Sequence, residues 1–245
     1  ELSGKHSGVI IRQRLRQVKL TDPGDADQYL WGDQSDRTTF KRVNADIVAK
    51  KPLFMKAWNN YYKGILEYMP GKKVTAVDAA KKTLLVEGIE EFKGDVVNFI
   101  PAQRAAAIAG KAGLIGEDKK WCPVNMTTFE STLQKNIHVI GDSAIAGAMP
   151  KSGYSANSQA KVCAINIVAL MNGKELTELS GVNVCYSAIS DHESISVAAV
   201  YTVKDGKIVS VPNSGGISPV DFSMTKAEHA YGESWLRNIL TEMST

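Results

Sequence analysis

The residues best suited to chemistry lie near the middle of the chain, where small and polar residues follow a predicted strand. Residues 137–140 are rich in β-branched side chains, which predicts a short buried strand, and Gly141-Asp142 follows it directly. A carboxylate there can accept hydrogen bonds from ligand hydroxyls, and the small residues at 144–149 let a ligand approach the backbone. The helix that follows would offer N–H groups and its positive dipole end to an anion. The pattern indicates a nucleotide site; the alternative is an ordinary strand-loop-helix unit of an α/β protein.

The helix that must position this run is predicted over residues 155–172. Apolar residues recur there at intervals of three and four, as on one face of a helix. Gly173 suits the C-cap, because glycine tolerates a positive φ. The residues on this predicted face are Ala160, Ala164, Ile167, Val168 and Met171.

Further elements are predicted on both sides of this unit. Helical spacing on either side of Pro52 predicts a pair of helices over residues 46–68, and a short helix is expected at 105–112. Runs of β-forming residues, turn signals and a last helical pattern predict strands at 73–78, 83–87, 91–99 and 182–187, a hairpin of 194–203 with 207–211, and a helix at 226–243.

Length and composition bound the class of protein. The 245 residues suit one large domain or two small ones, and 44% apolar with 22% charged residues is typical of a soluble globular protein. A net charge of +3 is too small to indicate nucleic-acid binding. No apolar run approaches the roughly 20 residues of a membrane helix, and no signal peptide opens the chain. No grouping of Ser, His and Asp rises above chance, so a hydrolase is not supported.

The three cysteines do not have the spacing of a zinc site, so no metal site is predicted. They are Cys122, Cys163 and Cys185. An odd number cannot pair fully within the chain, so at least one is free, reactive or bonded to another chain. For Cys122, between Trp121 and Pro123, we prefer a buried small hydrophobic residue.

Several longer runs of residues resemble one protein family. Ile-His-Val-Ile-Gly-Asp at 137–142, followed by Met-Pro-Lys-Ser-Gly-Tyr-Ser-Ala-Asn-Ser-Gln-Ala-Lys at 149–161, closely resembles the flavoprotein subunit of flavocytochrome c sulfide dehydrogenase. The likeness runs over residues 44–245, about four-fifths of the chain. It includes Trp-Cys-Pro-Val-Asn at 121–125 and Asn-Val-Cys-Tyr-Ser at 183–187.

The resemblance implies a fold class and a division of the chain. The class is α/β, a partial FAD/NAD(P)-binding, disulfide-reductase-like fold with a β-rich C-terminal domain. Residues 1–43 are then an unmatched basic and polar segment, residues 44–175 a partial FAD/NAD(P)-binding-like domain, and residues 176–245 the C-terminal domain of the sulfide dehydrogenase type.

The resemblance also implies FAD as the cofactor and assigns roles to particular residues. Asp142, with Gly141, would hold the ribityl chain, and Trp235 would shield the flavin. The residues expected around the flavin ring are Met149, Pro150, Lys151 and Ser152. Lys151 would place its charge near the flavin N1–C2 edge, and a solvated turn lysine is the equal alternative. For Trp235, a core aromatic residue is the favoured alternative.

Cys185 carries the catalytic role by the same resemblance. It matches one half of a redox-active cysteine pair that exchanges with sulfide, with the thiolate as the reactive form. The alternative is a buried strand cysteine. The second cysteine of the pair has no match in this sequence, nor has the cysteine that carries covalent FAD in many members.

The implied function is oxidation of sulfide through FAD, with electrons passing to a c-type cytochrome subunit in the periplasm. No Gly-Xaa-Gly-Xaa-Xaa-Gly fingerprint for the pyrophosphate occurs, so we expect a chain that lacks its N-terminal FAD half. The first alternative is a non-catalytic interaction module or truncated remnant that binds a cytochrome without FAD. A sulfide:quinone or NADH-type flavin oxidoreductase is disfavoured by the run at 149–154.

Residues 1–43 lie outside this likeness. They are basic and polar, and the part from Gly4 to Asp25 faintly resembles a segment near the C-terminal end of the bacterial RNA polymerase β′ subunit. The segment has no catalytic motif, and acidic residues interleave with the basic ones. We therefore favour a solvated basic face over a nucleic-acid partner, and rank a polymerase-related binding piece last. The likeness implies that this segment is foreign in origin to the rest of the chain.

Overall fold

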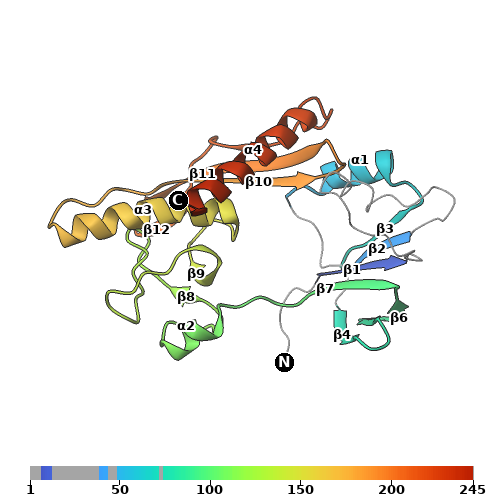
Figure 1. Ribbon diagram of the computed structural model, residues 1–245, viewed down its shortest axis with the longest axis horizontal. Helices are drawn as coiled ribbons and strands as arrows, with labels where there is room; N and C mark the ends of the chain where they lie inside the picture. The colour runs from blue at the N-terminus through green and yellow to red at the C-terminus, as the bar shows by residue number, and fades with distance from the viewer. Residues whose placement is uncertain (1–6, 13–38, 44–48, 72–73, 245) are drawn as a thin grey trace. The chain divides into compact units, whose positions relative to one another are not determined.

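The computed structural model describes residues 7–12, 39–43, 49–71 and 74–244, and it contains both helices and sheets (Figure 1). The chain divides into two compact units. The first extends to Ala102 and includes Ile189–Asp191, and the second holds the remaining residues from Gln103 onward. The predicted boundary between residues 175 and 176 stays a prediction, and most of the segment 1–43 lies outside the described residues.

The first unit combines a mixed sheet, an antiparallel meander and one helix. The mixed sheet has the order β3-β2-β1-β7, in which β2 and β3 are parallel and the other pairs antiparallel. Leu84 and Val74 are fully buried in the meander and form a small core with neighbouring apolar residues. The elements are β1 (Ser7–Arg12), β2 (Thr39–Val43), α1 (Lys51–Tyr61), β3 (Leu66–Met69), β4 (Val74–Asp78), β5 (Thr83–Val86), β6 (Ile89–Lys93) and β7 (Val96–Ile100).

Two predictions for this unit were wrong. Among the described residues of 46–68 there is one helix, α1, followed by strand β3. Pro52 lies in the first turn of α1, where its missing N–H has no helical acceptor and its fixed φ suits the helix, so it begins the helix instead of breaking one. The strand expected at 91–99 is two strands, β6 and β7, separated at Gly94-Asp95.

The second unit is built on an antiparallel sheet with the order β10-β11-β12, and α3 packs on β10 while α4 lies along β11 and β10 (Figure 1). Its core includes Phe129, Leu179 and Ile208, all 2% exposed or less. The elements are α2 (Ala107–Lys111), β8 (Cys122–Pro123), β9 (Ala144–Ile145), α3 (Gly153–Met171), β10 (Ser180–Ala188), β11 (Ser194–Lys204), β12 (Lys207–Ser210), β13 (Gly216–Ile217) and α4 (Thr225–Ser244).

Most predicted elements of this unit are confirmed within one to three residues at their ends. They are the helices α2, α3 and α4, the strand β10 and the hairpin of β11 with β12. Gly173 follows α3 with φ of +61°, as expected for its place after the helix. The buried position expected for Cys122 is also confirmed, since its side chain has no exposed surface.

The buried face of α3 is different from the predicted one. Val168 and Met171 are 59% and 81% exposed. The buried positions instead include three polar residues, Ser155, Gln159 and Asn166. They are buried because the surrounding loops supply hydrogen-bond partners: Asn166 alone bonds the carbonyls of Thr127 and Thr177 and the N–H of Thr177. Apolar spacing therefore identified the helix but not its inward face.

The strand expected at residues 137–140 is also absent. His138 forms a single bridge with Glu130, and Val139 N–H donates to the carbonyl of Phe129. The chain then enters the 3₁₀ helix η2 (Gly141–Ser143). These bonds run to the adjacent loop at 129–131 and not to a sheet, so the β-branched residues are extended without belonging to a regular strand.

Candidate functional site

Ser152 begins α3 and connects it to β10. It is the N-cap residue, in an extended conformation, and its Oγ accepts a hydrogen bond from Ser155 N at 3.1 Å. The same hydroxyl donates to Asn183 Oδ1 at 2.5 Å. Ser152, predicted to contact the flavin ring, thus has a structural role. Its hydroxyl accepts from a backbone N–H in the first turn of α3 and attaches that turn to β10.

Cys185 lies on β10 beside Asn183. Residues two apart on a strand point to the same face, and Asn183 Nδ2 is 3.2 Å from Cys185 Sγ. Asn183 is 3% exposed, whereas Cys185 is half-buried. Sequence reasoning did not single out Asn183. The only available signal was its position two residues before the cysteine in a strand, where a polar side chain facing a helix needs a partner.

A cavity of about 440 Å³ brings Cys185 together with two of the predicted cofactor residues, Ser152 and Trp235. Its walls come from the start of α3, from β10 and from α4. Trp235 stacks on Tyr154 with ring centroids 5.1 Å apart and planes 14° apart. The tryptophan is therefore neither a core residue nor a free surface one, and Tyr154 was not predicted as part of the site.

A second, smaller cavity of about 130 Å³ is lined by the other predicted ring contacts, Met149, Pro150 and Lys151, together with Gly141. Lys151 Nζ donates to the carbonyls of Asp142 and Ala144 and lies 3.8 Å from the ring centroid of Trp121. Partial burial lowers the pKa of Lys151, since it disfavours the charged form, while the nearby carboxylates of Asp142 and Asp118 act in the opposite direction.

Gly141 and Asp142 differ in how they are held. Gly141 has φ of +68°, and its N–H donates to Gln159 Oε1 at 2.7 Å. Asp142 is exposed and lines neither cavity. Within the described residues, its carboxylate accepts no hydrogen bond from another residue. A ligand hydroxyl could therefore use that carboxylate without displacing a protein contact.

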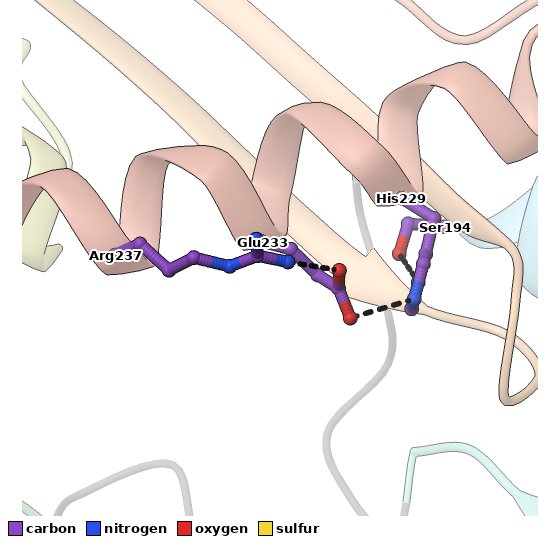
Figure 2. Close-up of polar contacts among 4 residues, drawn as sticks. All are labelled: Ser194, His229, Glu233 and Arg237. Carbon is purple, nitrogen blue, oxygen red and sulfur yellow. Dashed lines mark hydrogen bonds and ion pairs between the residues drawn. The ribbon is translucent and has the colours of Figure 1, made fainter.

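A further polar group lies where α4 crosses β11 (Figure 2). His229 Nδ1 is 3.2 Å from Ser194 Oγ, and His229 Nε2 is 3.4 Å from Glu233 Oε1. Arg237 Nη2 donates to the other oxygen of Glu233 at 2.9 Å. The sequence did not predict this Ser–His–Glu arrangement. Because Ser194 is only 5% exposed, we assign the group to attachment of α4 on the sheet.

The described residues fit part of a flavin site. Protein sites for drug-sized ligands enclose roughly 300–1,000 Å³, so the cavity of about 440 Å³ suits a ring system and not a whole dinucleotide. An aromatic stack, a cysteine and a helix N-terminus border it. No group of three or more metal-ligating side chains occurs in the described part of the chain, and none of its helices is long and apolar enough to cross a membrane.

Comparison with curated proteins gives only short matches. The chain is 46% identical over 50 residues to the DNA-directed RNA polymerase subunit beta′ of Roseiflexus sp. (strain RS-1), which is 20% of this chain and 3% of that protein. It is 48% identical over 46 residues to the same subunit of Opitutus terrae, again 3% of that protein's length. The chain therefore spans a very small part of these relatives.

Two solved structures show partial similarity. One is the sulfide:quinone oxidoreductase from Aquifex aeolicus, with a TM-score of 0.44, 14% identity, and coverage of 78% of this chain and 44% of that chain. The other is the Tetrahymena thermophila mitochondrial ATP synthase, with a TM-score of 0.44, 19% identity, and coverage of 61% and 36%.

Family models give matches in both units. Residues 41–101 match the central region of the sulfide dehydrogenase [flavocytochrome c] flavoprotein chain. Residues 178–243 match the flavin-binding region of flavocytochrome c sulphide dehydrogenase, and this match contains Asn183, Cys185 and Trp235. These families are flavin-binding flavoprotein domains, in agreement with FAD as the cofactor. The chain thus contains two regions that belong to the flavoprotein of flavocytochrome c sulphide dehydrogenase.

Proposed function

We propose that this chain takes part in flavin-dependent oxidation of sulfide, with Cys185 as the residue that reacts with sulfur. The observation that carries the proposal is the position of Cys185. It lies inside the flavin-binding family match and borders the cavity of about 440 Å³ together with Ser152 and Trp235. Formation of a sulfur–sulfur bond between the thiolate of Cys185 and sulfide releases two electrons, which FAD, when bound, would accept.

Residues of both cavities, and Asp142 outside them, have separate roles in this proposal. Ser152 and the first turn of α3 bind polar groups of the cofactor, and the exposed carboxylate of Asp142 accepts hydrogen bonds from its ribityl hydroxyls. Lys151 and the loop before it orient the ring, and the Tyr154–Trp235 stack excludes water from one side of the cavity. FAD, when bound, accepts the electron pair taken from sulfide.

The electron acceptor in this proposal is a c-type cytochrome subunit, and the location is the periplasm. The name of the matching family supports the cytochrome, since a flavocytochrome c joins a flavoprotein to such a partner. The proposed fold is the partial disulfide-reductase-like fold with a β-rich C-terminal domain. The pyrophosphate half of the FAD site would be supplied from outside the residues described.

A second candidate function is an interaction module that binds a cytochrome partner without FAD. The observation that favours it is an apolar surface on α4. Tyr231, Leu236 and Leu240 are each more than half exposed there, and Met243 is 77% exposed. Exposed apolar side chains gathered on one helix are a common feature of protein interfaces.

The visible spectrum of the purified chain separates the two candidates. An enzyme should show flavin absorption that sulfide bleaches, whereas a module should be colourless and still bind a c-type cytochrome. Cys185→Ser should retain flavin and lose bleaching by sulfide. The matched control is Cys163→Ser, whose hydroxyl can still donate to the carbonyl of Thr128 as the thiol does; bleaching should be unchanged in it. Bleaching at the native rate in Cys185→Ser would contradict the role of that residue.

Asp142→Ala tests the cofactor contact. Loss of the acceptor should lower the flavin retained after gel filtration, and Glu175→Ala, which removes an exposed carboxylate elsewhere, should not. Equal flavin content in all three proteins would contradict a ribityl contact at Asp142.

A further inference from the structure

Asn183 is held in one orientation by two serine hydroxyls. Ser152 Oγ lies 2.5 Å and Ser155 Oγ 3.2 Å from its Oδ1. Asn183 is 3% and Ser155 1% exposed, so solvent does not compete strongly for these bonds. The amide plane is therefore fixed by partners that belong to the first turn of α3.

The distances determine which end of the amide faces the sulfur. A separation of 2.5 Å belongs to the range of O–H···O hydrogen bonds and is too short for a usual N–H···O bond. Ser152 Oγ already accepts from Ser155 N, so its single hydrogen is available to donate to Asn183 Oδ1. The NH₂ end consequently faces Cys185, with Nδ2 at 3.2 Å from Sγ. Oδ1 is farther from Sγ, at 3.6 Å, and already has two donors.

A donor facing a sulfur atom has a chemical consequence. An amide N–H can only donate, so the sulfur of Cys185 accepts this hydrogen bond, and sulfur accepts more strongly as a thiolate than as a thiol. Cys163 has the opposite environment: its Sγ lies 3.5 Å from the carbonyl oxygen of Thr128, an acceptor that requires the thiol to keep its hydrogen. The two cysteines of the same unit therefore have opposite partners.

We propose that Asn183 is a positioning residue for Cys185. Its amide holds the sulfur of Cys185 in the cavity and stabilises the thiolate, and Ser152 fixes the amide in the required orientation. The relevance of this arrangement to sulfide rests on the proposed function. The arrangement itself does not, because it involves only residues of this chain.

The test measures the reactivity of Cys185 in the flavin-free chain. The rate of alkylation by iodoacetamide at neutral pH is followed at the Cys185 peptide by mass spectrometry. The ultraviolet absorption of the Cys185 thiolate is obtained by subtraction. The spectrum of each protein is compared with the spectrum of the same protein to which Cys185→Ser has been added. The variants are Asn183→Asp, which replaces the donor with an acceptor of the same shape, and Ser152→Ala. Asn125→Asp is the control, since Asn125 uses its Oδ1 to accept from Thr127 N and Thr128 N, as an aspartate also can, and makes no contact with Cys185.

Asn183→Asp should slow alkylation about tenfold or more and remove the thiolate absorption, because a hydrogen bond to a charged group is lost and a like charge is introduced. Ser152→Ala should slow it about threefold, since the amide remains but can rotate. Asn125→Asp should react as the native chain does. Native rates and absorption in Asn183→Asp would overturn the proposal.

The outcomes also separate this inference from the proposed function. If Asn183→Asp does not fold, alkylation of the buried Cys163 will reveal it, and Ser152→Ala then decides: an unchanged rate in that variant overturns the inference. A chain that binds no flavin but shows slower alkylation in both variants refutes the proposed function and retains the inference. A chain that binds flavin but shows unchanged alkylation in both variants refutes the inference and retains the proposed function.

Discussion

The two cavities beside the start of α3 are built in different ways. The smaller one is lined mainly by residues 141–151, together with Trp121 and Gln159: Lys151 bonds carbonyls only a few residues away, and Gln159 bonds the N–H of Gly141. The larger one is formed by α3, β10 and α4, which are far apart in the sequence. The first depends on local backbone bonds, and the second depends on tertiary packing of side chains. Substitutions should therefore affect them separately.

The largest effect is expected at Gly147, in the wall of the smaller cavity. Gly147→Ala places a Cβ 2.7 Å from the carbonyl oxygen of Ile208 at a φ of +57°. Steric overlap and backbone strain together should lower the free energy of unfolding by about 3 kcal/mol or more. Gly206→Ala is the control, because its φ is +69° but nothing lies within 4 Å of the new atom; it should cost about 1 kcal/mol. Urea denaturation measures both, and equal losses would contradict steric contact as the cause.

An intermediate effect is expected at Gln159, which is 1% exposed. Gln159→Leu leaves the N–H of Gly141 without its acceptor and should cost about 2 kcal/mol. Gln134→Leu, at an exposed glutamine, should change stability by less than about 0.5 kcal/mol. Alkylation of Cys185 should not change in Gln159→Leu. A large change there would show that the two cavities are coupled.

A smaller effect is expected where α4 is attached to the sheet. His229→Ala removes the partner of the buried Ser194 hydroxyl and should cost about 1 kcal/mol in thermal or urea unfolding. Arg237→Ala is the control, since its side chain is 76% exposed and its ion pair with Glu233 contributes little. If Arg237→Ala costs as much as His229→Ala, the surface ion pair, and not the bond to Ser194, holds the helix.

The smallest effect concerns the pH dependence of stability. Burial raises the pKa of Cys122 and of Cys163, so both thiols stay protonated in the folded chain at pH values where an unfolded thiol, with a pKa of about 8.5, ionises. Their contribution to the free energy of unfolding is fully present below that pH. It is lost as the pH rises further, because the unfolded state then releases protons that the folded state keeps. The free energy of unfolding should therefore fall in the mildly alkaline range. Cys163→Ser should make the fall shallower, and an unchanged slope would contradict this account.

The sequence predicted the local features of the second unit well, for physical reasons visible in particular residues. Apolar spacing over residues 155–172 predicts α3, Lys-Asp-Gly at 204–206 predicts the turn of the hairpin, and the β-rich run around Cys185 predicts a strand. Each depends on conformational preferences of a few neighbouring residues. Of the residue strings quoted for the family resemblance, the one at 183–187 lies inside a family match, whereas those at 121–125 and 137–161 lie outside both matches.

The features that the sequence did not predict depend on partners distant along the chain. The polar face of α3 is buried because loops at residues 127 and 177 supply its hydrogen-bond partners, which no periodicity contains. Asn183 orients its amide only because α3 places two serines against it. The pairing of Trp235 with Tyr154 similarly requires α4 to lie beside the start of α3. The predicted roles of the cofactor residues and of Cys185 stay predictions until flavin binding is measured.

The stack of Tyr154 on Trp235 has a consequence for the order of assembly. Contacts between residues so far apart in sequence form only after a long segment of chain has been closed, which makes them slow to form and dependent on the complete C-terminal helix. During synthesis, α3 and its serine cap can form before α4 has left the ribosome. The larger cavity, in contrast, gains its last wall only when α4 has been made, so its cysteine becomes enclosed after α3 and β10 have formed.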